Sequence, residues 1–136
     1  MTTPRSRIVV GFDGSEGSEK ALRWAADQAR LGGAKVDVVR AWLPGEFGTN
    51  EELAHIVDKR LEEDVFSVLG DDPGFELNLI TEHGRPAKVL IEMARGADML
   101  VVGSRGHGGF TGLLVGSVSQ QVTAHANAPV VVIVKA

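Results

Sequence analysis

Short apolar runs alternate along the chain with stretches whose apolar residues recur every three or four positions. The runs predict β-strands, and the helically spaced stretches predict amphipathic α-helices. The predicted strands cover residues 8–12, 36–42, 75–82, 98–103 and 129–134. Helices are predicted between them, over residues 16–31, 53–68, 86–96 and 116–127. No apolar segment approaches the roughly 20 residues that a membrane-spanning helix needs.

The order of these elements indicates an α/β fold. Strands that are separated by helices of this length pair in parallel through right-handed crossovers. The predicted architecture is a doubly wound, five-stranded parallel sheet sandwiched by four helices. Ligands of such folds bind outside the carboxyl ends of the strands, where the strand order reverses. We therefore expect residues 12–14, 41–42, 82–84 and 103–106 to gather at one edge of the sheet.

Composition narrows the class of protein. The 136 residues suit a single domain over residues 1–136, and 43% hydrophobic residues argue against disorder. A net charge of −4 disfavours nonspecific binding to nucleic acid. The lack of cysteine excludes disulfides, thiolate metal sites and cysteine nucleophiles. The first residues lack the apolar core of a signal peptide, so we expect a cytoplasmic protein with no membrane association.

A glycine-rich segment is the strongest candidate site. Residues 103–116, GSRGHGGFTGLLVG, hold six glycines between a predicted buried strand and a predicted helix. Glycine lets a ligand approach the backbone closely, and successive amides together with a helix N-terminus attract phosphate. Side-chain donors are available at Arg105, His107, Ser117 and Ser119. The pattern predicts a polyphosphate site; the alternative is a surface loop whose glycines only ease a tight connection.

Two common phosphate motifs are absent. The Walker motif requires a lysine, which this segment lacks, and the first strand runs into GFDGSEG rather than the dinucleotide fingerprint. A serine-hydrolase elbow around Ser104 is also absent. The scattered histidines show no metal-binding pair, and His83 and Arg85 suit an ordinary turn as well as a ligand edge.

The spacing of the glycines resembles a known signature. Gly103, two residues, Gly106, nine residues, then Gly116 and Ser117 is similar to the ATP-binding signature of the universal stress protein family. The resemblance extends over nearly the whole chain, through VVGFDGSEGSEKAL, EHGRPAKVLIEMARGADMLVVGSRGHGG and GSVSQQVTAHANAPVVVIV. It implies a Rossmann-like fold of the adenine nucleotide alpha hydrolase type, and it places the chain with the ATP-binding members of the family.

The resemblance implies roles for individual residues. Asp13 would lie by the nucleotide and help to hold Mg²⁺, and Ala41 would contact adenine chiefly through its backbone. From the residues alone, Asp13 suits a helix cap near Ser15 equally well. Trp42 is a candidate for the pocket wall. The full predicted nucleotide site comprises Gly11, Asp13, Ala41, Gly103, Ser104, Arg105, Gly106, His107, Gly108, Gly109, Gly116, Ser117, Val118 and Ser119.

The C-terminal run PVVVIV is flat and apolar, so it would be a liability as an uncovered edge strand. In the stress-protein family the last strand pairs with its twofold mate, and we expect a homodimer through this strand. The predicted function is a dimeric, ATP-dependent switch or sensor in the stress response.

Two alternatives stay open for the function. In one, the chain is a protein–protein interaction module with a vestigial or structural nucleotide site, whose acidic second helix binds a partner. In the other, it is a weak ATPase or an adenylating enzyme. No catalytic residue is predicted: at most, Asp13 with Mg²⁺ supports slow ATP hydrolysis, or Ser117 or Ser119 is autophosphorylated.

Overall fold

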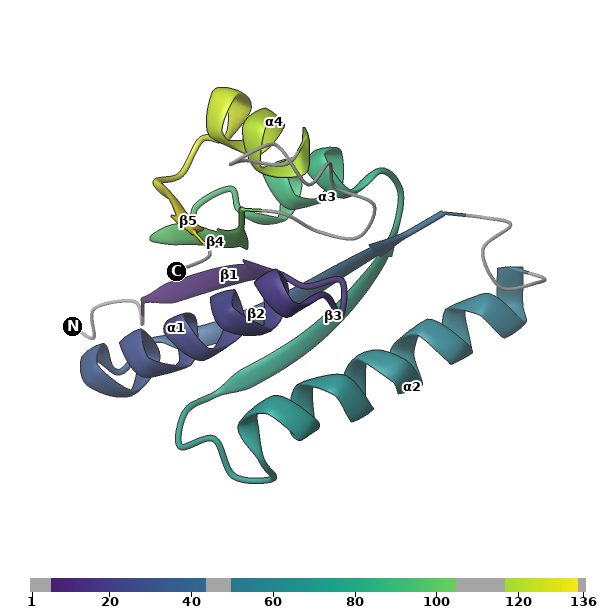
Figure 1. Ribbon diagram of the computed structural model, residues 1–136, viewed down its shortest axis with the longest axis horizontal. Coiled ribbons are helices and arrows are strands. Elements are labelled where there is room, and N and C mark those ends of the chain that lie inside the picture. Colours follow the sequence, from purple (N-terminus) through teal and green to yellow (C-terminus); the bar gives the residue numbers. More distant parts are fainter. Residues whose placement is uncertain (1–5, 44–49, 105–116, 135–136) are drawn as a thin grey trace.

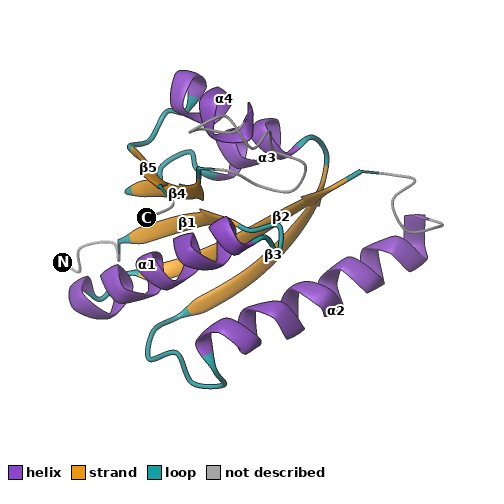
Figure 2. Ribbon diagram, viewed as in Figure 1, coloured by secondary structure: helices purple, strands orange, loops and turns teal. Residues whose placement is uncertain are grey.

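The computed structural model describes residues 6–43, 50–104 and 117–134, and these residues form a parallel sheet with helices on both faces (Figures 1 and 2). In chain order the elements are β1 (Arg7–Gly11), α1 (Glu16–Gly32), β2 (Lys35–Trp42), α2 (Asn50–Leu69), β3 (Leu77–His83), α3 (Pro86–Met93), β4 (Met99–Gly103), α4 (Ser117–His125) and β5 (Val130–Ile133). All strand pairs are parallel, in the order β3-β2-β1-β4-β5. The predicted doubly wound α/β fold is confirmed.

The helices form two layers around the sheet. Figure 1 shows α1 and α2 over one face, and α3 and α4 over the other. Valine-rich β1 and β4 are buried on both faces, as expected of central parallel strands. Alternate residues of the strands pack into two hydrophobic cores, one on each face of the sheet. Val10 and Val38 pack under α1 and α2, whereas Val9 and Val39 pack under α3 and α4. None of the described helices is long and apolar enough to cross a membrane.

Some boundaries differ from those that the pattern predicts. Helix α3 ends at Met93 rather than near Gly96. Ala94 is its C-cap, and residues 94–96 form a turn in which Gly96 adopts a φ of 77°. Strand β3 begins at Leu77, two residues later than predicted. The C-terminal strand β5 lies at an edge of the sheet, beside β4, and its four residues are half-buried.

Helix α1 begins immediately after the carboxyl end of β1. Ser15 is its N-cap, and the Ser15 side chain accepts a hydrogen bond from the backbone N–H of Ser18 at 3.2 Å. At the other end Gly33 takes the left-handed conformation, with a φ of 72°, and its N–H donates to the carbonyl of Ala29. The local sequence thus places the positive end of the α1 dipole at the carboxyl edge of the sheet.

An arginine network ties the opposite edge of the sheet together. The Arg7 guanidinium lies 3.1 Å from the Oδ2 atom of buried Asp37, and the Oδ1 atom of Asp37 accepts a hydrogen bond from Asn78. The same guanidinium donates to the carbonyl of Met93, the last residue of α3, and to the carbonyl of Arg95, two residues further on. This network is remote from the carboxyl ends of the strands, so we assign it a structural role.

Candidate functional site

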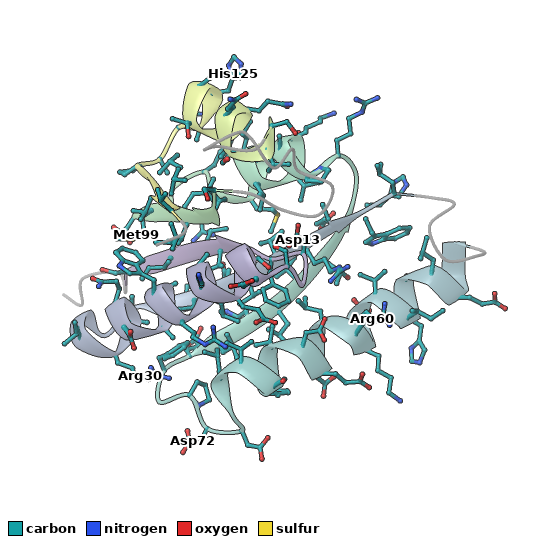
Figure 3. All side chains as sticks on the ribbon, in the orientation of Figure 1. Asp13, Arg30, Arg60, Asp72, Met99 and His125 are labelled. Carbon is teal, nitrogen blue, oxygen red and sulfur yellow. The ribbon has the colours of Figure 1, made fainter. Side chains whose placement is uncertain are left out.

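The reversal in strand order lies between β1 and β4. The chain leaves β1 for α1 on one face of the sheet, and α4, the helix that follows β4, lies on the other face. A crevice is expected between such diverging connections, and it is where open α/β sheets bind their ligands. Asp13, Gly103 and Ser104 all lie at this switch point, and Figure 3 shows Asp13 at the end of β1.

Asp13 closes a turn at this edge. Its Oδ1 atom accepts a hydrogen bond from the N–H of Ser15 at 2.9 Å, and its own N–H donates to the hydroxyl of Ser18 at 3.3 Å. The N-cap itself is Ser15, so Asp13 stabilises the turn that leads into the cap rather than serving as the cap. The half-buried carboxylate is held beside the N-terminus of α1, where a negative charge is favourable.

Two predicted glycines lie in tight surroundings. A Cβ atom on Gly103 would lie 2.6 Å from the carbonyl carbon of Gly17, in the first turn of α1. A Cβ atom on Gly11 would lie 2.7 Å from Cδ1 of Leu90, on α3. Gly103 therefore has a structural reason for glycine, because its neighbour is backbone, whereas the Leu90 side chain could shift to make room at Gly11. The contact of both residues with a ligand stays a prediction.

The first turn of α4 separates its two serines. Ser117 opens the helix and is exposed, whereas Ser119 is buried. The Ser119 hydroxyl donates a hydrogen bond to the carbonyl oxygen of Ser104 at 3.1 Å. Val118 packs against the core under α3 and α4. Ser117 is therefore an exposed hydroxyl at the N-terminus of α4. The hydrogen bond of Ser119 joins α4 to Ser104, the residue after β4.

The remaining residues of the predicted phosphate site, Arg105, Gly106, His107, Gly108, Gly109 and Gly116, lie outside the described residues. The predicted adenine contact, Ala41, is next to the last residue of β2, in register with Glu82 of β3. Its side chain packs on the α3 side of the sheet.

Sequence reasoning missed a contact beside Ala41. The rings of Trp42 and His83 meet edge to face, with centroids 4.8 Å apart and an interplanar angle of 63°. Both residues end their strands, and they are partners in the β2–β3 register. A signal existed in the aromatic residues at both strand ends, but the register that pairs them is set by long-range packing.

The described side chains could hold Mg²⁺ only together with oxygen atoms of a bound ligand. Within the described part of the chain, no group of three or more His, Cys, Asp or Glu side chains is placed to hold a metal ion. Mg²⁺ is commonly held by one or two carboxylates together with substrate phosphates and water. Asp13 fits that arrangement as the carboxylate, with the phosphates of a nucleotide supplying the other ligands.

Comparisons with known protein sequences identify the family of this chain. The family model of the universal stress protein family matches residues 4–134. A universal stress protein of Mycolicibacterium smegmatis is 35% identical over 134 residues, covering 95% of this chain and 46% of that protein. The chain thus spans about half the length of the curated relatives it matches.

Solved structures give the same result. The universal stress protein from Archaeoglobus fulgidus in complex with dAMP is 27% identical, with a TM-score of 0.72, over 96% of this chain and 98% of that one. A universal stress protein in complex with cAMP is 26% identical, with a TM-score of 0.70 and the same coverage. This chain belongs to the universal stress protein family.

Proposed function

We propose that this chain binds an adenine nucleotide, ATP with Mg²⁺, across the carboxyl edge of its sheet. The observation that carries the proposal is the meeting of the Asp13 turn, the end of β4 at Gly103 and the first turn of α4 at the β1–β4 switch point. Relatives crystallised with cAMP and dAMP support adenine as the base.

The proposed site has a direction along the sheet. Its phosphate end lies at β4 and α4, where Ser117 opens the helix and where the glycine-rich segment joins the two elements. Asp13 lies at the end of β1 and would hold Mg²⁺ against the phosphates. The base end lies over β2, where the backbone of Ala41 would meet adenine.

The nucleotide would act as a switch on a cytoplasmic homodimer in the stress response. Helix α4 runs from the phosphate end of the site and is followed by the edge strand β5. The dimer would pair β5 with the same strand of a second copy, which covers an otherwise open edge. Ordering of the α4 N-terminus by phosphate would thereby bias the dimer interface. We expect at most weak ATP hydrolysis, since the residues that the structure describes near the phosphate end of the site offer no general base besides Asp13.

A protein-interaction module is the second candidate function. Helix α2 presents exposed acidic side chains, including Glu52, Glu62 and Glu63. Such a face is ordinarily only solvated, so this function becomes the preferred one only if the nucleotide site is empty in solution.

Isothermal titration of nucleotide-stripped protein with MgATP tests the proposal. We expect saturable binding with a single nucleotide per chain. Gly106→Val should abolish binding with the fold intact, because it would place a side chain against the phosphates. Gly32→Ala is the matched control, since a Cβ atom there has no neighbour within 4 Å. A folded wild-type protein that binds no nucleotide would contradict the proposal and favour the interaction module.

A further inference from the structure

The strands β2 and β3 end together in an aromatic pair. Trp42 and His83 are the last residues of their strands and face each other in register. Their rings meet edge to face at a centroid distance of 4.8 Å, a favourable geometry for aromatic pairs. The N–H of Gly84 donates to the carbonyl of Trp42 at 2.9 Å, so the chain that leaves β3 is also held to the end of β2.

The pair projects from the α2 side of the sheet. Side chains of a strand alternate between its faces. On β2, Val38 packs under α1 and α2, and Trp42 is four residues further along the same face. On β3, the hydroxyl of Thr81 is hydrogen-bonded to Asp58 of α2, and His83 is two residues further on that face. Ala41 lies on the opposite, α3 side of the sheet.

The pair lies at the base end of the proposed site. Neighbouring strands are about 4.8 Å apart, so a nucleotide whose phosphates lie at β4 and α4 has its base over β2. The base would meet the backbone of Ala41 there, and Trp42 is the next residue. We infer that Trp42, oriented by His83, forms an aromatic wall that holds the base of the nucleotide, an inference that rests on the proposed nucleotide site.

The exposure of the two rings suits this role. Trp42 is half-buried, so part of its ring surface is accessible, and His83 is exposed. The edge contact from His83 restricts the orientation of the indole. The indole therefore loses less conformational entropy when a ligand binds. Stacking against an aromatic ring tolerates any base, because every base has a π-face. The wall therefore adds affinity for the base but does not distinguish adenine from guanine.

The affinity test compares substitutions of Trp42 in titrations with MgATP. Stacking of a base on an aromatic side chain commonly changes affinity about tenfold or more, so Trp42→Leu should weaken ATP binding by about that factor. Trp42→Phe keeps an aromatic face and should retain most of the affinity. His83→Ala should weaken binding less than Trp42→Leu, because His83 acts through the indole.

A fluorescence test separates contact with the base from a merely structural role. Trp24→Phe leaves Trp42 as the only indole of the chain. In that background MgATP should quench the emission of Trp42, whereas inorganic tripolyphosphate, which lacks a base, should not. Circular dichroism and thermal unfolding establish that each variant is folded. If Trp42→Leu does not fold, the inference is tested by the quenching experiment and by the ATP affinities of Trp42→Phe and His83→Ala.

The outcomes distinguish this inference from the proposed function. If the wild type binds MgATP but Trp42→Leu binds it equally well, or if ATP leaves the emission of Trp42 unchanged, the aromatic wall is wrong and the nucleotide site stands. If tripolyphosphate quenches Trp42 as ATP does, the indole senses the phosphate end and the wall is again wrong. If the folded wild type binds no nucleotide, both proposals fail.

Discussion

Gly103 at the end of β4 lies against Gly17 in the first turn of α1, so closely that a Cβ atom on Gly103 would be 2.6 Å from the carbonyl carbon of Gly17 and 2.7 Å from its oxygen. The neighbour is backbone, which cannot rotate aside as a side chain can. The contact joins the two elements that border the switch point. It shows that the first glycine of the phosphate signature has a packing role besides any contact with a ligand.

Gly103→Ala should therefore destabilise the protein. Overpacking of this kind typically costs about 1–3 kcal/mol, and we expect the upper half of that range because the clash is with backbone. Urea unfolding followed by circular dichroism measures the change. Nucleotide affinity should fall as well, since α1 and β4 must separate at the proposed site.

Gly32→Ala provides the matched control for this substitution. It also adds one methyl group to a glycine, but no atom lies within 4 Å of the added Cβ. Gly32 is the last residue of α1, where alanine favours helix by up to about 1 kcal/mol. Equal stability of Gly103→Ala and Gly32→Ala would show that the Gly103–Gly17 contact relaxes without cost.

The fold could be predicted from the sequence because its signals are local and strong. The valines of β1 and β4 form short runs that are buried on both faces, and α1 carries its alanines at helical spacing. The order of the elements then leaves few topologies. By contrast, the contact between Arg7 and Asp37 joins positions 30 residues apart, and no local sequence pattern predicts it.

The site could be located but not assembled from the sequence. Asp13 and Gly103 were expected at the carboxyl edge, and the structure places both there. The sequence does not predict the direction in which a side chain of an element points. The structure shows the Ser119 hydroxyl donating to the carbonyl of Ser104, and its predicted contact with phosphate stays a prediction. The pairing of Trp42 with His83 depends on the β2–β3 register, which only tertiary packing determines.

Asp13→Asn separates the turn from the proposed metal site. An amide oxygen can still accept the hydrogen bond from the N–H of Ser15, which the carboxylate accepts at 2.9 Å, but it carries no charge. We expect stability to fall by at most about 1 kcal/mol, the value of a charge at a helix N-terminus. Titration with ATP in the presence of Mg²⁺ and of a chelator should show that the variant loses the gain in affinity that Mg²⁺ gives the wild type.

Asp13→Ala is the companion variant. It removes both the charge and the acceptor, and it should cost about 1 kcal/mol more than Asp13→Asn. An Asp13→Asn protein whose ATP affinity still rises with Mg²⁺ would exclude Asp13 as the metal ligand and leave it with the turn alone.

Ser119→Ala tests the link between α4 and the end of β4. The substitution removes a buried hydroxyl and deprives the carbonyl of Ser104 of a donor at 3.1 Å. Loss of such a bond usually costs about 1–2 kcal/mol, which thermal or urea unfolding detects. Because the bond joins Ser104, near the start of the glycine-rich segment, to Ser119, just beyond its end, ATP affinity should fall with stability.

Thr123→Ala is the control for Ser119→Ala. The Thr123 hydroxyl also donates to a backbone carbonyl, that of Ser119, but Thr123 is exposed, so water can replace the lost partner. Its removal should change stability by less than about 0.5 kcal/mol. If the two variants were equally stable, the buried hydrogen bond of Ser119 would contribute no more to the free energy of unfolding than the exposed bond of Thr123.

The edge strand β5 offers a selective test of the proposed dimer. The carbonyl of Pro129 accepts a hydrogen bond from the N–H of Leu100 in β4 at 2.8 Å, and the carbonyl of Ile133 accepts one from the N–H of Ser104, just after β4, at 2.9 Å. The N–H and C=O groups of one strand residue point to the same side and alternate along the strand. The backbone groups of Val132 therefore point away from β4, toward the edge at which a second copy would pair.

Val132→Pro should convert the dimer to a monomer without unfolding it. Proline removes the outward N–H, and edge strands tolerate proline where that group faces away from the sheet. Val132→Thr keeps the N–H and the β-branched shape and should remain dimeric. Light scattering coupled to size-exclusion chromatography measures the mass of each variant, with circular dichroism as the check on folding. A Val132→Pro protein that stays dimeric would place the interface elsewhere, and a monomeric wild type would refute the proposed dimer. If Val132→Pro is monomeric and folded, titration of that monomer with MgATP also shows whether nucleotide binding requires the β5 contact, because Asp13, Gly103 and Ser117 all belong to one chain.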